Sequence, residues 1–150
     1  MKNRMNRREV LSQLGGLSLA AVAMNTVAEE HQHHHHQMGA SKYQLLIDAT
    51  GDCISKGEAC LAHCLMLLAD GDAKMAGCAK SVNQTIALCR ALQSLAAQGS
   101  SLTVALAKVA LDACLDCEKE CRKHEDKHQE CKACREACSD CVKQCKAIIA

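Results

Sequence analysis

The chain has no proline, phenylalanine or tryptophan, and Tyr43 is its single tyrosine. Strands favour aromatic and β-branched side chains, which are sparse here, whereas the abundant alanine, leucine, lysine, glutamate and glutamine favour helices. We therefore expect an all-α protein, with room for one domain in 150 residues. A formal net charge of +1 and a single aromatic residue disfavour nucleic-acid binding, which needs a basic surface and stacking platforms.

Cysteine, by contrast, occurs thirteen times. The number is odd, and thiols spaced along helices do not resemble the loop-rich framework of a small disulfide-stapled domain. Cysteine can be buried as a small hydrophobe, but thirteen in one small domain far exceed that use. We therefore expect a metal site. No catalytic nucleophile, base or oxyanion arrangement is visible, so the sequence indicates a binding protein and not an enzyme.

The last third of the chain shows how these thiols are arranged. Between Cys114 and Cys145 the eight cysteines follow one another at steps of three, four, ten, three, four, three and four residues. Steps of three and four keep side chains on one helical face, because each residue turns the helix by about 100°. The ten-residue step contains residues 124–129, which we interpret as a corner between two helices.

The helical period extends back to Ser41. We expect helices over about 42–69, from about 72 to just before Gly99, from Ser100 or Ser101 to about 124, and from about 127 or 129 to 149. Ser41 and Gln44 have the form of a capping box, and Ser100 or Ser101 can cap the third helix. Four helices joined by short corners predict an antiparallel up-down-up-down four-helix bundle over residues 41–150 with a Cys-lined core.

Residues 1–28 have the architecture of an export signal, with a basic start and a run of small apolar residues that is too short to span a membrane. Arg7 and Arg8, with Leu11 behind them, resemble a twin-arginine signal, which carries folded proteins across the bacterial inner membrane. An ordinary secretory signal is the alternative. We expect cleavage after residue 23 or 28, and export to the periplasm or to a compartment associated with internal membranes.

Residues 29–40 are polar and include five histidines between His31 and His36. The segment has no apolar period, so we expect it to be disordered. A histidine-rich tract can capture metal from solution; a solvated linker and an inserted affinity tag are the other interpretations.

The choice of metal follows from charge and softness. The Cys-x-x-Cys pairs suggest zinc, but they lie in uninterrupted helical pattern, and three four-thiolate zinc sites would bury a charge of about −6 without matching cations. Iron–sulfur binding is disfavoured because the Cys-Pro of the ferredoxin run is absent. Cu(I) is soft and content with two sulfurs, so sulfurs that each bridge two coppers give a nearly neutral core, with capacity on the order of a dozen ions. Loading then releases roughly one proton per thiol.

The four predicted helices also order the thiols by depth. Six lie toward the end that holds the first and third corners, and seven lie deeper, while leucines and an isoleucine form an apolar plug at the opposite end. The six are Cys60, Cys64, Cys78, Cys121, Cys131 and Cys134; the seven are Cys53, Cys89, Cys114, Cys117, Cys138, Cys141 and Cys145; the plug is Leu45, Leu46, Leu92, Leu95, Leu102, Leu106 and Ile148.

Three further side chains with affinity for copper lie near the corners, on the edges of the cysteine stripes. They are His63, Met75 and His124, whereas the phase of Met66 points it away. A thioether and imidazoles there can take up or hand over Cu(I) with a weaker grip than thiolates. Solvated side chains at helix ends are the alternative interpretation.

With these residues in place, the chain resembles the bacterial copper storage proteins, in their exported form with a twin-arginine signal. The likeness covers residues 41–150 and rests on all thirteen cysteines at helical spacing. The resemblance implies a bundle that fills with Cu(I) through one open end, assembly into homotetramers, and a role in holding copper for enzymes such as methane monooxygenase. It also implies that His63 and Met75 line the open end.

Two other functions use the same residues. A copper chaperone or detoxifying sink shares the ligands but differs in how readily copper leaves, so copper-acceptor proteins are possible partners. A thiol redox protein would use the Cys-x-x-Cys pairs, but it needs an exposed thiol with a lowered pKa, and this pattern buries nearly all of them.

Overall fold

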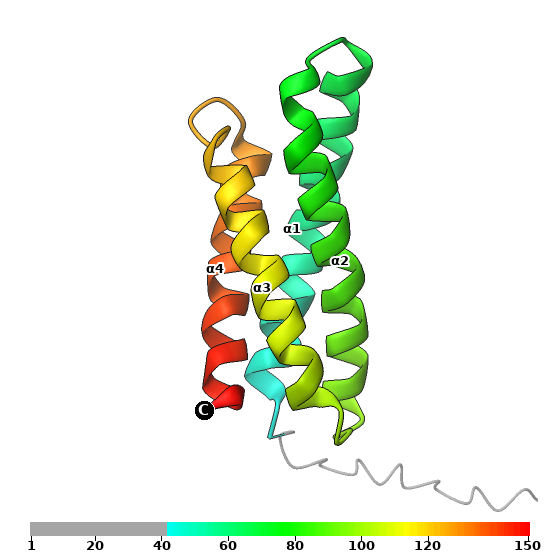
Figure 1. Cartoon of the computed structure of the whole chain (residues 1–150), viewed down its shortest axis with the longest axis vertical. Coiled ribbons are helices and arrows are strands. Elements are labelled where there is room, and N and C mark those ends of the chain that lie inside the picture. The colour runs from blue at the N-terminus through cyan, green and yellow to red at the C-terminus, as the bar shows by residue number, and fades with distance from the viewer. Residues whose placement is uncertain (1–41) are drawn as a thin grey trace, which may run out of the picture. The chain divides into compact units, whose positions relative to one another are not determined.

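A computed structural model of the chain describes residues 42–150, and the predicted signal of residues 1–28 and the histidine-rich segment of residues 29–40 lie outside them. The elements are α1 (Gln44–Ala69), the short 3-10 helix η1 (Ala73–Met75), α2 (Ala76–Ala97), α3 (Thr103–Arg122) and α4 (Gln129–Ile149). Each long helix packs against the two helices beside it in the order α1, α2, α3, α4, as Figure 1 shows. The predicted all-α four-helix bundle is confirmed.

Each of the first two corners contains a glycine whose backbone adopts the left-handed conformation. Gly71 has φ 93° and Gly99 has φ 63°, a conformation in which a side chain would be strained. After α1 the amide of Asp72 donates to the carbonyl of Leu67 at 2.9 Å, and the amide of Gly71 donates to Leu68 at 3.1 Å. These bonds satisfy carbonyls at the end of the helix and turn the chain back. The predicted ends of the first two helices are correct.

The predicted helix starts are only partly right. Ser41 lies outside the described residues, and the Gln44 side chain donates to Asp48 at 2.8 Å instead of reaching back to form a capping box. The third helix begins at Thr103, later than predicted, because the Ser100 hydroxyl accepts the amide of Leu102 at 3.2 Å and fixes a turn before the helix. The fourth helix begins at Gln129, one of the two predicted starts.

One end of the bundle holds the turn between α1 and α2 and the turn between α3 and α4; we call it the corner end (Figure 1). At the opposite end Leu46 and Leu92 are fully buried, as predicted for the apolar plug. Leu45 and Leu102, however, are 69% and 61% exposed, so their assignment to the plug is wrong. Leu45 is one residue from Leu46 and so points about 100° away, and Leu102 precedes the first turn of α3.

Buried threonines complete this plug. Thr50 and Thr103 are fully buried, and each donates its hydroxyl to a nearby backbone carbonyl, Thr50 to Leu46 at 2.8 Å and Thr103 to Ser100 at 2.7 Å. The hydroxyls are therefore satisfied without a partner in the core. None of the described helices is both long and apolar enough to cross a membrane.

Candidate metal centre

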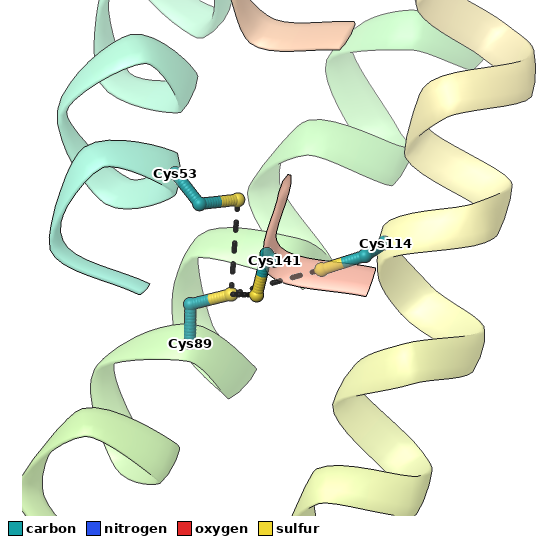
Figure 2. A group of neighbouring side chains, drawn as sticks. All are labelled: Cys53, Cys89, Cys114 and Cys141. Atoms are coloured by element: carbon teal, nitrogen blue, oxygen red, sulfur yellow. Dashed lines mark hydrogen bonds between the residues drawn. The ribbon is translucent and has the colours of Figure 1, made fainter. Parts of the chain in front are cut away.

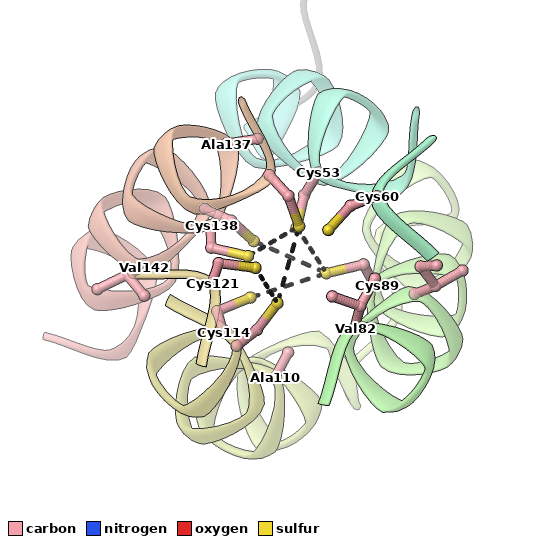
Figure 3. Packing of buried hydrophobic residues seen from close by; sticks show 14 of the residues in the cluster. Cys53, Cys60, Val82, Cys89, Ala110, Cys114, Cys121, Ala137, Cys138 and Val142 are labelled. Carbon is pink, nitrogen blue, oxygen red and sulfur yellow. Dashed lines mark hydrogen bonds between the residues drawn. The ribbon is translucent and has the colours of Figure 1, made fainter. Parts of the chain in front are cut away.

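All thirteen cysteines belong to the buried core, and Figure 3 shows six of them, from all four helices, pointing toward the bundle axis. Every one is at most 1% exposed, and every one is a free thiol. The helical phase predicted from sequence is therefore the phase that the structure shows. On α3 and α4 the thiols are three or four positions apart, so successive thiols lie about one turn apart along the axis. The spacing is wider elsewhere: about two turns separate Cys53 from Cys60 on α1, and about three separate Cys78 from Cys89 on α2.

One thiol from each helix meets in the inner half of the core. The Sγ atom of Cys89 on α2 lies 3.8 Å from that of Cys53 on α1, and 3.9 Å from those of Cys114 on α3 and Cys141 on α4 (Figure 2). The four sulfurs lie within 4.8 Å of one another. Each helix thus supplies one ligand to a single compact group.

A second group of four lies toward the corner end. The Sγ atom of Cys60 lies 4.0 Å from Cys64, 3.9 Å from Cys78 and 3.8 Å from Cys131. From Cys78 the sulfur contacts continue to Cys121, at 3.6 Å. Spacings of this size let one small ion touch two sulfurs after a modest adjustment of rotamers, since a metal–sulfur bond is about 2.3 Å long.

Sulfur contacts of 4.0 Å or less divide the described thiols into two networks. The corner network contains Cys60, Cys64, Cys78, Cys117, Cys121, Cys131 and Cys134. The inner network contains Cys53, Cys89, Cys114, Cys138 and Cys141. Cys145 follows about one turn beyond Cys141 on α4 and is counted with this network.

Cys117 is the one thiol whose contacts differ from its predicted depth. The sequence places Cys117 among the seven deeper cysteines. In the structure it contacts Cys121 at 3.9 Å and Cys134 at 3.8 Å, and both of these belong to the corner network. The reason is that one turn of α3 separates Cys117 from Cys121, which is short enough for their side chains to meet.

No cation balances the thiols. Among residues 42–150 no lysine or arginine is buried, and the buried polar side chains are Thr50, Ser81, Thr85 and Thr103. Full ionisation of the apoprotein core would therefore be very costly. The empty core therefore disfavours full ionisation of its thiols, and the filled core favours a monovalent metal.

Hydrogen bonds among the thiols shift their pKa values in both directions. Hydrogen bonds to neighbouring thiols, followed by burial, raise the pKa of Cys89, Cys121, Cys138 and Cys145. The pKa is also raised for Cys60, Cys78, Cys114 and Cys131. Hydrogen bonds with neighbouring thiols lower the pKa of Cys64, Cys134 and Cys141, and lower that of Cys53 to about 5.

The corner end carries a pair of imidazoles. His63 Nε2 on α1 lies 2.9 Å from Nδ1 of His128, which precedes α4, and 3.7 Å from a carboxylate oxygen of Glu130. The side chain of His63 is 16% exposed, so the pair is accessible but partly shielded. His124 lies further off, with its ring centroid 6.4 Å from that of His128.

His128 was missed by the sequence reasoning, which singled out His63, Met75 and His124. The available signal was its position in the corner at the same end as His63. Met75 is fully buried in η1, and Met66 is 55% exposed, as its phase predicted. His63 and Met75 are therefore correctly placed near the corner end; whether they bind copper stays a prediction.

A helical bundle whose axis is lined with free, buried thiols defines a metal-binding protein of the class that holds many soft ions at once. The profile of the copper storage protein family matches residues 39–150, and the chain belongs to that family. Comparison with curated protein sequences gave no significant match.

Two solved structures resemble the chain at 26–27% sequence identity. Apo copper storage protein 3 from Bacillus subtilis is 27% identical, with a TM-score of 0.63 over 71% of this chain and 98% of that one. The Cu(I)-bound copper storage protein BsCsp3 is 26% identical, with a TM-score of 0.65 over 73% of this chain and 100% of that one. The second structure is of a relative that binds Cu(I).

Proposed function

We propose that this protein stores Cu(I) in its core, with all thirteen cysteines as ligands and capacity on the order of a dozen ions. The proposal rests on thirteen buried free thiols on all four helices, twelve of which are joined by contacts of 3.6–4.0 Å into two networks. Cu(I) selects thiolates and accepts low coordination, and one copper per bridging thiolate leaves the core nearly neutral. Membership of the copper storage family supports this function.

Zinc fits the same residues poorly. A tetrahedral zinc ion with four thiolates carries a charge of −2, and the core has no buried lysine or arginine in residues 42–150 to offset several such sites. Cys60 of the corner group of four also belongs to a second group, with Cys121 and Cys134, so the corner thiols do not form one separate closed site. A soft monovalent ion removes both difficulties.

The direct test is an anaerobic titration of the fully reduced protein with Cu(I), in competition with a chromophoric chelator. We expect binding to continue to about a dozen equivalents, with roughly one proton released per thiol. A parallel titration with Zn²⁺ is expected to stop at far fewer ions. Saturation with Cu(I) at one or two equivalents would end the storage hypothesis.

A copper chaperone or detoxifying sink is the second candidate, and the half-buried pair of His63 and His128 is the observation that favours exchange at the corner end. The two functions differ in the rate at which copper leaves. Transfer of copper to an excess of a competing acceptor within seconds would indicate a chaperone, whereas release over hours would indicate a store.

A thiol redox protein remains the least supported function. All thirteen thiols are at most 1% exposed, whereas a redox-active thiol must be reached by its partner. We expect slow labelling of the folded apoprotein by a thiol reagent, and fast labelling after unfolding. We also expect a binding protein without catalytic activity, because no accessible nucleophile is present among these thiols.

Export, assembly and delivery complete the proposal. We infer that residues 1–28 direct a folded, reduced protein out of the cytoplasm by a twin-arginine route, which would protect the thiols from oxidation before copper binds. Recovery of the exported protein fully disulfide-bonded would refute this. We also infer a homotetramer that passes copper to acceptor enzymes; light scattering of the purified protein tests the assembly.

A further inference from the structure

The two sulfur networks approach each other at one place. Four groups of thiols have all their sulfurs within 4.8 Å of one another, and one of the four draws from both networks. It consists of Cys117 and Cys134 from the corner network and Cys138 from the inner network. The other three groups each belong to a single network, so Cys138 is the contact between the two halves of the core.

Within 4.0 Å, Cys138 has one neighbour in the inner network, and Cys114 of the same network interacts with it at longer range. The Sγ of Cys138 lies 3.8 Å from that of Cys53, which in turn lies 3.8 Å from Cys89 (Figure 3). Cys138 is fully buried on α4, one turn from Cys134 and close to one turn from Cys141. It therefore occupies the level of the axis at which the corner network ends.

Apart from the thiols, the part of the chain that the structure describes offers no soft ligand beside Cys138. Met75 is the one fully buried methionine there, and it belongs to η1 at the corner end. The residues packed around the middle of the bundle include Val82, Ile86 and Ala137, which cannot hold copper. An ion that moves along the axis must then be passed from sulfur to sulfur.

We propose that Cys138 is the relay through which Cu(I) passes from the corner network to the inner network. The proposal rests on the proposed storage function and on uptake at the corner end. A copper held by Cys117 or Cys134 gains a bond to Cys138 as it loses one of its former bonds. The proton displaced from the Cys138 thiol passes to the thiolate left behind, so neither copper nor sulfur changes oxidation state.

This arrangement predicts filling in two stages. The seven thiols of the corner network fill first, and the inner network fills only as copper leaves Cys138 for Cys53. Loss of the Cys138 sulfur removes the step between them, because Cys53 is not among the thiols grouped with Cys117 and Cys134. Removal of a thiol elsewhere in the inner network removes a ligand but leaves the passage open.

The test compares Cys138→Ser with Cys145→Ser, a matched change of one buried inner thiol at the far end of the set. Cu(I) is delivered anaerobically from a chelator complex, and loading is followed by stopped-flow absorbance of the copper–thiolate bands and by native mass spectrometry. Circular dichroism establishes that both variants fold, and Cys138→Ala serves as a second variant in case serine disturbs the core.

We expect C145S to lose about one copper and to load at the rate of the wild type. We expect C138S to accumulate at about seven coppers, the number of thiols in the corner network, and then to load the remainder at least about tenfold more slowly. If the wild type fills but C138S and C138A load in the same single course as C145S, the relay is wrong and storage stands. If the wild type stops at one or two coppers, both are wrong.

Discussion

The Sγ atoms of Cys78 and Cys121 lie 3.6 Å apart across the interface of α2 and α3, and both thiols are free. A disulfide would need the same two atoms at about 2.05 Å. The pair is thus close enough to be bridged by a metal ion or, after a small shift, by oxidation. Oxidation and copper binding compete for the same sulfurs.

The first prediction follows from that competition. Treatment of the apoprotein with diamide is expected to lower its Cu(I) capacity by about two ions for each disulfide formed, because one bridging thiolate balances one copper. Protein loaded with copper before the treatment should keep its capacity. The number of remaining thiols is counted after the protein is unfolded without reductant, and the Cu(I) titration gives the capacity. Unchanged capacity after the loss of several thiols would contradict the assignment of these cysteines as ligands.

The second prediction concerns Cys89, whose sulfur contacts three others at 3.8–3.9 Å. Cys89→Ser should remove more than one bound copper, because three neighbouring thiols lose a shared partner. The buried hydroxyl should also lower the free energy of unfolding of the apoprotein by about 1–3 kcal/mol. Cu(I) titration and guanidinium unfolding check the two effects.

Cys145→Ser is the control for this change. Cys145 belongs to none of the groups of described thiols whose sulfurs lie within 4.8 Å of one another, so its loss should cost about one copper. An equal loss of copper in C89S and C145S would show that the close contacts of Cys89 do not decide how many copper ions its group of four thiols binds.

The third prediction concerns the imidazole pair at the corner end. His63→Ala and His128→Ala are each expected to slow copper uptake about tenfold without changing capacity, because the two rings act as one site beside the corner network. The double variant should be no slower than either single variant, since either change breaks the pair. His124→Ala, whose ring lies 6.4 Å from that of His128, is the comparison. Stopped-flow loading measures the rates, and additive effects would argue for two independent sites.

The fourth prediction separates helix packing from metal binding. A Cβ atom on Gly57 would lie 2.9 Å from Cγ1 of Ile86 in the α1–α2 interface. A Cβ on Gly51 would also lie 2.9 Å from its neighbour, but that neighbour is the side-chain nitrogen of Gln93, which can turn away at the cost of its hydrogen bond to the Ile47 carbonyl. Gly57→Ala should therefore be less stable than Gly51→Ala by about 1–2 kcal/mol, because overpacking is relieved with more difficulty in a buried core. Guanidinium unfolding of the apoproteins measures the difference. Equal free energies of unfolding for the two variants would mean that α2 can move away from α1 at little cost.

The fifth prediction is a loss of apoprotein stability above pH 9. Eight thiols, Cys89 and Cys138 among them, have a pKa raised above the usual 9.0. Below pH 9 these thiols keep their protons in both states, but above it the unfolded chain loses them first, so unfolding becomes more favourable. Each such thiol should lower the free energy of unfolding by about 1 kcal/mol between pH 9 and pH 10.

The four thiols with a lowered pKa act in a different range. Cys53, lowered to about 5 by its neighbours, is ionised in both states above pH 9 and loses its contribution only as the pH falls from 9 toward 5. Anaerobic unfolding between pH 8 and pH 10 measures the alkaline effect. The Cu(I)-loaded protein is the control, because its thiols have already lost their protons, and a flat profile for the apoprotein would contradict the raised pKa values.

Much of this structure was predictable from sequence because cysteines spaced three and four residues apart must share one face of a helix. The stripe from Cys131 to Cys145 could face only one direction, and the lack of aromatic side chains left helices as the available element. Gly71 and Gly99 marked where the first two helices end, since only glycine adopts their backbone conformation without strain.

What could not be predicted depends on contacts across the bundle. The pairing of His63 with His128 joins residues 65 positions apart, and His128 lies outside the helical pattern that guided the assignment. The division of the thiols into two networks depends on the relative height of four helices, which periodicity does not set. Leu45 was misplaced because it lies one residue, about 100°, from the buried Leu46, and Leu102 because it precedes the first turn of α3.

The small size of the buried side chains has a consequence for calorimetry. Leucine, methionine and valine occupy few fully buried positions, and the rest of the axis is mostly cysteine and alanine. Unfolding therefore exposes little hydrocarbon for a bundle of this length, and the heat-capacity increment of the apoprotein should fall below the usual ~12–15 cal/mol/K per residue. Cargo bound only by the folded chain should raise the melting temperature with each equivalent added, so that the store becomes more heat-resistant as it fills.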